Sequence, residues 1–247
     1  MRSISCGRVV LGGSGVLFGG IALLWRDPAT WQNLRHIWSL PLGVNLGAGI
    51  MAAQIAGGFG VLYPRTVRPA SAVLCLVYLC FSLACIPDII AAANLYDKFG
   101  GSFFLFLSLF FGSLAVFASA EQDQSKAALF GRGARLGLGV CSISFALGQG
   151  LLLRQTAGAV PKWIPPGQMF WAIATTAAFA LAAGAMLSNR HARLAVRLLT
   201  LMVGLFGGLV WAPLLTLSPR EHFLWSELAE TLLVTGAAWS IGDLKHL

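Results

Sequence analysis

Gln54 and Asp88 are polar residues that lie in or near long apolar stretches of the sequence. Polar side chains are costly in hydrocarbon, so in membrane proteins they usually face a bundle interior or a cavity. The Gln54 amide could hydrogen-bond a polar ligand, a quinone carbonyl or a neighbouring helix. Asp88 follows Pro87 and could take up protons, or it could simply be an acid at a helix end. Both are candidate ligand-binding residues.

Glu227 and Glu230 are three residues apart and would share one face of a helix. Together with the nearby Glu221 and His222, these carboxylates could hold a cation. Acids are also favoured at a helix N-terminus, because the helix dipole stabilises negative charge there. We therefore expect any ligand cavity to open towards the outer leaflet and to be lined by Gln54, Asp88, Glu227 or Glu230.

The other residues that carry catalytic chemistry do not form a known pattern. The four histidines lie in the connections and the tail, whereas a membrane haem needs histidines within facing helices. The sequence contains no His-x-x-x-His, no phosphate-binding Gly-rich loop, no Gly-x-Ser-x-Gly and no Cys-x-x-Cys. We predict no metal site and identify no cofactor from the residues themselves, and catalytic residues stay unknown.

The elements that must position these residues are membrane helices. Hydrophobic residues make up 57% of the chain and charged residues only 11%, and the mean hydropathy is +0.77. A soluble domain carries about a quarter charged residues. A crossing uses roughly 20 apolar residues, so the chain can hold about seven to nine. This predicts an all-α, polytopic bundle whose main solvent is the lipid bilayer.

Apolar runs between charges and prolines predict eight transmembrane helices. Gly and Ala are frequent within them, as in Gly57-Gly58-x-Gly60, and small residues let helix backbones approach closely. We therefore expect tight packing. The predicted spans are 9–25, 43–63, 69–91, 101–120, 134–153, 168–187, 194–217 and 224–241.

Basic residues are distributed unevenly between the two predicted faces. Eleven Lys and Arg lie on the side that carries both termini and six on the other side, which also holds six of the nine acids. Lys and Arg favour the cytoplasmic side. This indicates an inner (plasma) membrane protein of bacterial type with both termini in the cytoplasm. Arginines beside anionic headgroups explain the net charge of +8, so no nucleic-acid partner is expected.

An offset of 125 residues aligns similar segments of the two halves. It places Trp38-Ser39-Leu40-Pro41 on Trp163-Ile164-Pro165-Pro166, and Pro64-Arg65-x-x-Arg68 on Asn189-Arg190-x-x-Arg193. Each half then holds four helices, and because four is even, both halves enter the membrane in the same sense. We predict two parallel four-helix repeats, 1–120 and 121–247.

Tryptophans gather at the predicted outer ends of the helices, as expected of an aromatic belt at the headgroups. Trp38 and Trp163 have a second interpretation. The segment 31–38 could lie flat on the outer leaflet and, with Lys162 and Trp163, cover a hydrophobic mouth open to lipids or quinone. Both tryptophans are therefore candidate ligand-binding residues.

The stretch Val160-Pro161-Lys162-Trp163-Ile164-Pro165-Pro166, followed by Phe170-Trp171 and a Gly/Ala-rich helix ending in Leu187-Ser188-Asn189-Arg190, resembles the DoxX-like family of small four-helix membrane proteins. The resemblance covers about residues 136–239 and is weaker in the first half. Some family members are membrane subunits of thiosulfate:quinone oxidoreductase. The resemblance thus implies a quinone-linked role but supplies no agreed catalytic residues.

Three functions are compatible with these features. The resemblance favours a non-catalytic membrane component that is associated with a redox partner subunit in or near the quinone pool. Parallel repeats and acids on the outer side are also typical of a transporter or channel for a small or lipid-like molecule. The third interpretation is an intramembrane enzyme acting on a lipid or quinone.

Overall fold

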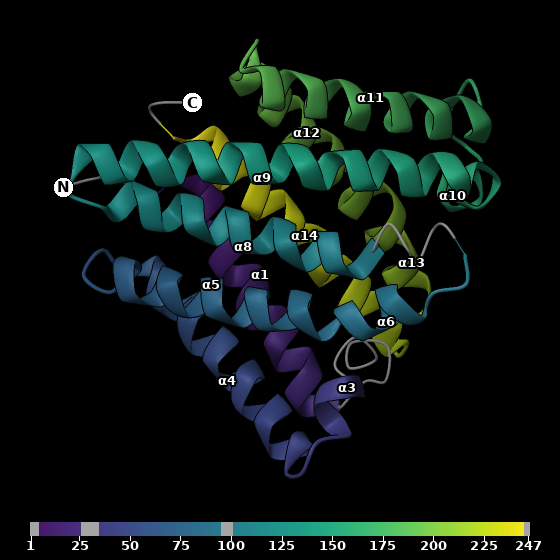
Figure 1. The fold of residues 1–247 in the computed structure, drawn as a ribbon. Helices are drawn as coiled ribbons and strands as arrows, with labels where there is room; N and C mark the ends of the chain where they lie inside the picture. Colours follow the sequence, from purple (N-terminus) through teal and green to yellow (C-terminus); the bar gives the residue numbers. More distant parts are fainter. Residues whose placement is uncertain (1–4, 26–34, 95–100, 245–247) are drawn as a thin grey trace.

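The computed structural model describes residues 5–25, 35–94 and 101–244, and these form helices joined by short connections, with no strand among them. Figure 1 shows their arrangement. The longer helices are α1 (Cys6–Trp25), α4 (Gly43–Leu62), α5 (Val67–Ala84), α8 (Gly101–Ala120), α9 (Gln124–Leu151), α11 (Gln168–Ser188), α12 (Ala192–Phe206) and α14 (His222–Gly242). The shorter ones are α3 (Arg35–Trp38), α6 (Ile86–Ala91), α10 (Leu153–Ala159), the π-helical η2 (Gly207–Trp211) and α13 (Ala212–Leu217).

Seven helices are long and apolar enough to cross a membrane, which confirms a polytopic helical membrane protein. They are α1, α4, α5 with α6, α8, α9, α11, and α12 with η2 and α13. The eighth predicted span corresponds to α14, which has 21 residues and carries Glu227 and Glu230 but is not among these seven. The first turn of α1 and the last turn of α14 lie at the same end of the bundle, as Figure 1 shows.

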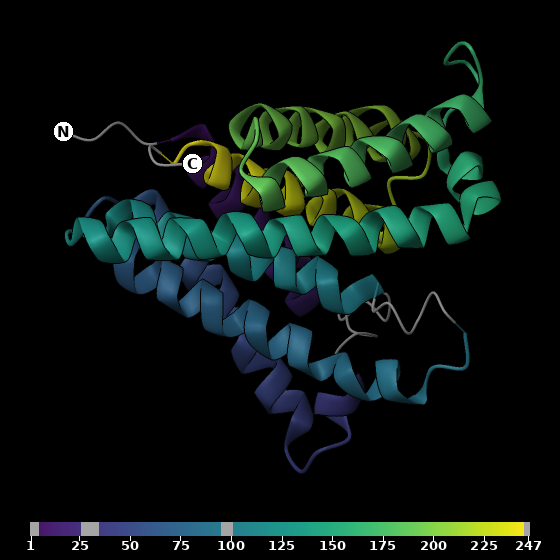
Figure 2. The same ribbon diagram turned by 45° about the horizontal axis from the view of Figure 1, so that its top comes forward.

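The long helices pack in a closed cyclic order. Each of α1, α4, α5, α8, α9, α11, α12 and α14 contacts the next in this series, and α14 contacts α1 again. Helix α8 also packs directly against α14, across the ring. Figure 2 shows α9 running the length of the bundle, with α11 and α12 on one side and α4 and α5 on the other.

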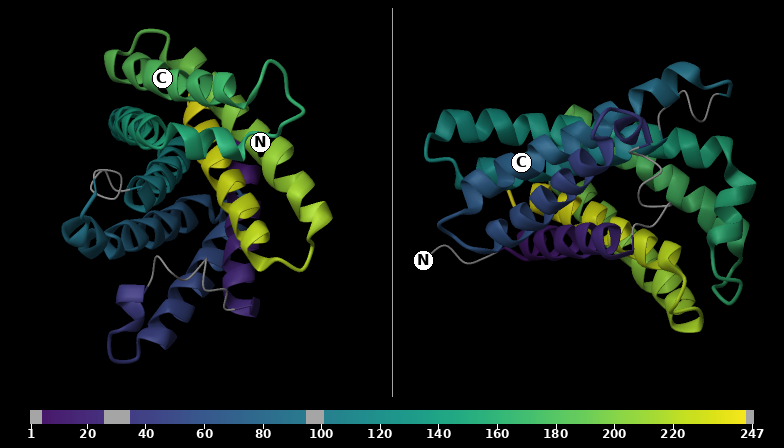
Figure 3. Two further views of the ribbon diagram at one scale, coloured as in Figure 1. Left: turned by 90° about the vertical axis from the view of Figure 1, so that its right-hand side faces the viewer. Right: turned by 90° about the horizontal axis from the view of Figure 1, so that it is seen from below.

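Helices α1 and α14 pack along each other where the first-half and second-half helices meet (Figure 3). Small residues allow this close packing. A Cβ at Gly12 of α1 would lie 2.7 Å from the carbonyl oxygen of Gly58 of α4, so only glycine fits there. Gly236 of α14 packs against the backbone of Leu11, and Gly112 of α8 packs against Ala237 of α14.

The packing of the first half has a counterpart in the second. Within each half, the first long helix contacts the second, the second contacts the third and the third contacts the fourth. The fourth helix of each half also packs against the first helix of the other half, as α8 does against α9 and α14 against α1. At the central crossing, Gly112 and Ala237 are separated by 125 residues, which is the offset seen in the sequence.

Several helix boundaries differ from the predicted spans. Helix α9 begins ten residues before the predicted 134, because Asp123 caps it by accepting hydrogen bonds from the N–H groups of Ser125 and Lys126. The predicted span 69–91 is interrupted at Cys85, ahead of Pro87. The predicted span 194–217 contains the π-helical turn η2 just before Pro213. Proline lacks an N–H, so both breaks follow from the sequence.

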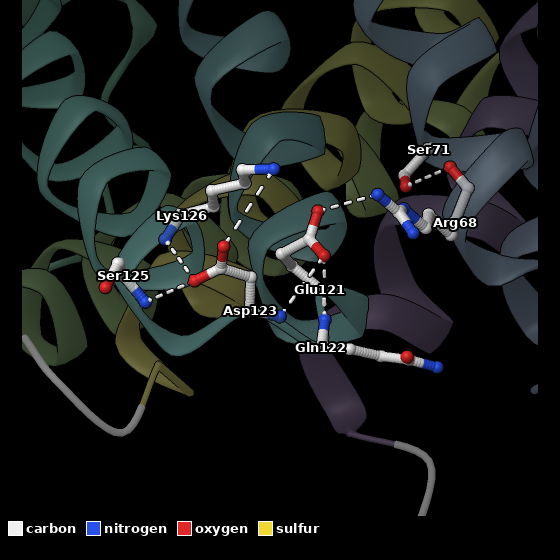
Figure 4. A network of polar contacts seen from close by, with 7 residues as sticks. All are labelled: Arg68, Ser71, Glu121, Gln122, Asp123, Ser125 and Lys126. Atoms are coloured by element: carbon white, nitrogen blue, oxygen red, sulfur yellow. Dashed lines mark hydrogen bonds and ion pairs between the residues drawn. The ribbon is translucent and has the colours of Figure 1, made fainter.

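The connection between α8 and α9 is held by the network of polar contacts drawn in Figure 4. Arg68, near the start of α5, donates from Nη2 to Oε2 of Glu121 at 2.7 Å. The second Glu121 oxygen accepts the N–H groups of Gln122 at 2.8 Å and Asp123 at 3.3 Å. The pKa of Glu121 lies below its ordinary value, mainly because its carboxylate accepts the N–H of Gln122. The N–H of Asp123 and the charge of Arg68 lower this pKa further, whereas burial raises it.

We expect Glu121→Gln to lower the thermal midpoint of unfolding at pH 7, because a neutral amide weakens these contacts. Since folding lowers the pKa of Glu121, the carboxylate contributes stability above its unfolded pKa of about 4.3, and this contribution is lost as pH falls through the lower folded value. The wild-type and Glu121→Gln midpoints should thus converge below about pH 4. Parallel melts from pH 3 to 7 test this; a difference that does not depend on pH would contradict it.

Candidate ligand-binding cavity

Helix α14 places Glu227 and Glu230 one turn apart inside the bundle. The helix begins at His222, after Pro219, and its first turns lie at the end of the bundle opposite the start of α1. The ring of His222 stacks on Trp25 at the end of α1, with centroids 4.3 Å apart, which joins α1 and α14 there. Both glutamates are half-buried, whereas the neighbouring Glu221 is exposed. Their spacing of three residues directs both to the same side.

That side of α14 faces a cavity with a volume of ≈ 500 Å³. Ligand sites of small molecules typically occupy about 300–1,000 Å³. The walls come from α8, α9, α10, α11, α12, η2 and α14, so six second-half elements and one first-half helix contribute. Phe145, Phe179, Val203, Phe206 and Val210 form much of the apolar wall.

The polar side chains that line the cavity are either acidic or uncharged. Besides Glu227 and Glu230, it includes Gln149, Thr156 and Thr231, and no Lys or Arg is among the described lining residues. No hydrogen bond or ion pair reaches either glutamate from the part of the chain that the structure describes. Carboxylates that face an apolar cavity without a partner favour a ligand that brings positive charge or hydrogen-bond donors.

Gln54 lies elsewhere. Its side chain on α4 is fully buried, and it is not among the residues that line the cavity. The amide faces the hydroxyl of Tyr78 on α5, but neither group reaches hydrogen-bonding geometry with a described partner. Leaving such buried groups unpaired costs about 1–3 kcal/mol each. Gln54 is therefore a polar position within the first-half core.

Asp88 and Trp163 also lie outside the cavity lining. Asp88, on α6, interacts with His36 of α3, whose Nε2 lies 2.9 Å from Oδ1, and this pair ties α3 to α6. Trp163 is 69% exposed in the connection before α11. The side chain of Trp38 lies outside the described residues. Of the six candidates, the structure thus brings together Glu227 and Glu230.

Gln149 was not singled out from the sequence, although it lies within the predicted span 134–153 and meets the same criterion as Gln54. Its Oε1 accepts hydrogen bonds from the hydroxyls of Thr175 and Thr176 on α11, at 3.3 and 3.4 Å. These contacts hold the amide at the cavity wall. An amide in the middle of an apolar run was the available signal; the aromatic wall residues gave none, because they resemble ordinary core residues.

Comparisons with known proteins do not identify a family for this chain. No family model, curated protein or solved structure matches the chain. The function must therefore be argued from the cavity and from the residues that line it.

Proposed function

We propose that this membrane protein binds a small amphipathic cation, an apolar body with a protonated amine, in the cavity beside α14. The observation that carries this proposal is the pair of carboxylates, Glu227 and Glu230, which have no partner among the described residues and lie in a cavity whose other walls are largely apolar. An amine could donate to both carboxylates while its apolar part contacts Phe145 and Phe206. An anionic ligand would be repelled from the same position.

The π-helical turn η2 favours transport as the role of this binding site. Val210 and Trp211, in the π-helical turn η2, belong to the cavity lining. Membrane transporters use interrupted helices where the backbone borders a cavity, and π-helical turns are frequent at functional sites. We therefore place the protein among membrane proteins that take a lipid-like molecule from the outer leaflet, rather than among enzymes.

The binding proposal is tested with three ligands that share one apolar body: octylamine, octanol and octyl sulfate. Each is titrated into the purified protein in a non-ionic detergent, and binding is measured by calorimetry. We expect octylamine to bind at least about tenfold more tightly than octanol, since a charge-assisted hydrogen bond contributes about 1.5–3 kcal/mol. Equal affinities for the amine and the sulfate would refute a cation site.

The two-unit architecture and the orientation are further proposals. The matching packing of the two halves and the contact between Gly112 and Ala237 support parallel units 1–120 and 121–247. A related pair of contacts also supports them. Arg68 binds Glu121 just after α8, and Arg193, 125 residues later, donates to the carbonyl of Leu244 just after α14.

We predict that both termini face the cytoplasm. In a protein without native cysteines, Gly158→Cys should react with an impermeant maleimide added outside intact cells, and Ser125→Cys should not. Both positions are exposed, so access of the reagent depends on the side of the membrane. Labelling at 125 but not at 158 would invert the orientation. A bacterial inner membrane is the setting that the distribution of basic residues favours.

The DoxX-like resemblance also implies a redox partner subunit and a bound quinone. Both remain predictions. Purification of the native protein in a mild detergent, followed by mass spectrometry and an absorbance spectrum of the extracted lipids, tests both. A stoichiometric redox subunit or quinone would favour the resemblance over the cation site.

A further inference from the structure

A second groove, of ≈ 450 Å³, lies between α12 and α14 and extends to the last turn of α14. It shares no lining residue with the glutamate cavity. The groove is lined by Arg197, Thr200, Leu201, Gly204, Leu205, Thr235, Trp239, Gly242 and Asp243.

Small residues border this groove on both helices. A Cβ at Gly204 would stand 3.4 Å from the Thr235 side chain, and one at Gly242 would stand 3.4 Å from Val196, so both glycines lie where α12 and α14 contact each other beside the groove. From Gly242 to Thr235 the groove follows α14 for about 10 Å at 1.5 Å per residue. Because α12 belongs to a candidate membrane span, this length can accommodate part of a lipid acyl chain.

One end of the groove carries both of its charges. Arg197 is exposed on α12, and Asp243 directly follows the last turn of α14. No ion pair joins the two within the part of the chain that the structure describes. Asp243 accepts one long hydrogen bond, 3.4 Å, from the N–H of Gly7. A positive and a negative group thus lie together at the mouth of an apolar groove.

We propose that this groove binds a zwitterionic phospholipid whose headgroup carries a primary amine. Arg197 contacts the phosphate, Asp243 accepts from the ammonium, and one acyl chain lies along Gly204 and Thr235. Guanidinium groups suit phosphate oxygens because they donate several hydrogen bonds in a fixed geometry. A headgroup with only negative charge would satisfy Arg197 but be repelled by Asp243, and a trimethylammonium group could not donate to the carboxylate.

The test uses the full chain, delipidated in detergent and titrated with phospholipids of identical acyl chains, with binding followed by native mass spectrometry. The headgroups are phosphatidylethanolamine, phosphatidylcholine and phosphatidylglycerol. We expect phosphatidylethanolamine to bind most tightly, by about fivefold or more over the others, which corresponds to about 1 kcal/mol. Equal binding of all three headgroups would refute the proposal.

Two variants test whether Arg197 and Asp243 contact the lipid headgroup. Arg197→Gln should weaken phosphatidylethanolamine binding, whereas Arg190→Gln, which removes an exposed arginine at the same end but outside the groove, should not. Asp243→Asn should abolish the preference over phosphatidylglycerol while retaining binding. Circular dichroism confirms that each variant is folded. If Arg197→Gln and Arg190→Gln bind alike, or if Asp243→Asn keeps the preference, the groove is not a headgroup site.

Discussion

Replacing Glu230 with Gln is expected to weaken octylamine binding by about 10- to 100-fold. The amide keeps the size of the side chain but removes the charge that would pair with an ammonium group, a contact worth about 1.5–3 kcal/mol. Glu227→Gln should weaken binding in the same way, because both residues line the cavity and neither pairs with another residue that the structure describes. Titration calorimetry in detergent measures the loss.

The matched control is Glu221→Gln, which removes an exposed glutamate just before the start of α14 and outside the cavity. It should bind octylamine as the wild type does. A further result is expected without ligand: Glu230→Gln should raise the thermal midpoint, because a half-buried carboxylate without a partner is costly to desolvate. Equal losses in Glu221→Gln and Glu230→Gln would show that overall charge, and not the cavity, attracts the amine.

The Gly112→Ala substitution is expected to cause the largest loss of stability of any single methyl addition in the α8–α14 interface. A Cβ at Gly112 would overlap both Cα and Cβ of Ala237, and the backbone cannot move aside as a flexible side chain could. Overpacking of this kind costs about 1–3 kcal/mol or more. Thermal unfolding in detergent should show a markedly lower midpoint and a larger aggregated fraction.

Gly13→Ala on α1 is the control, because a Cβ at Gly13 meets no atom within 4 Å. It should be neutral or stabilising, since Ala is favoured over Gly in a helix interior by about 1 kcal/mol. If the two variants melted at the same temperature, the close approach of α8 and α14 would be wrong.

Most of the fold could be predicted from hydropathy, because each crossing must satisfy its backbone hydrogen bonds within one helix. The boundaries were less predictable where polar residues remain helical. Residues 124–133 of α9 are too polar for a membrane span, yet Asp123 caps them and they continue the helix. Pro213 accounts for an interruption in its span, but a hydropathy pattern does not show that the interruption takes the form of the π-helical turn η2.

The glutamates of the cavity could be predicted, since charged residues on an apolar helix need a reason to be there. Their surroundings could not, because the walls come from helices far apart in the sequence. Gln54 and Glu227 satisfy the same sequence criterion, yet Gln54 faces Tyr78 in a packed core. Which polar residue borders open space depends on the volumes of its neighbours.

Those volumes differ between the two halves at positions 125 residues apart. Val203 and Thr231, which line the cavity, correspond to Tyr78 and Phe106 in the first half. Tyr78 and Phe106 are both almost completely buried, and each packs edge-on against the same ring, Phe81. In the proposed two-unit architecture, larger side chains thus occupy the corresponding place in the first half, which accounts for a ligand site in the second half alone.

Photo-crosslinking tests the cation site most directly. An alkylamine that carries a diazirine is bound to the wild-type protein in membranes, irradiated, and its adducts are mapped by peptide mass spectrometry. The cavity account predicts adducts on α9, α12, η2 and α14 that excess octylamine suppresses and that Glu230→Gln reduces. Adducts spread over lipid-facing positions of α4 and α5, unaffected by octylamine or by Glu230→Gln, would contradict it.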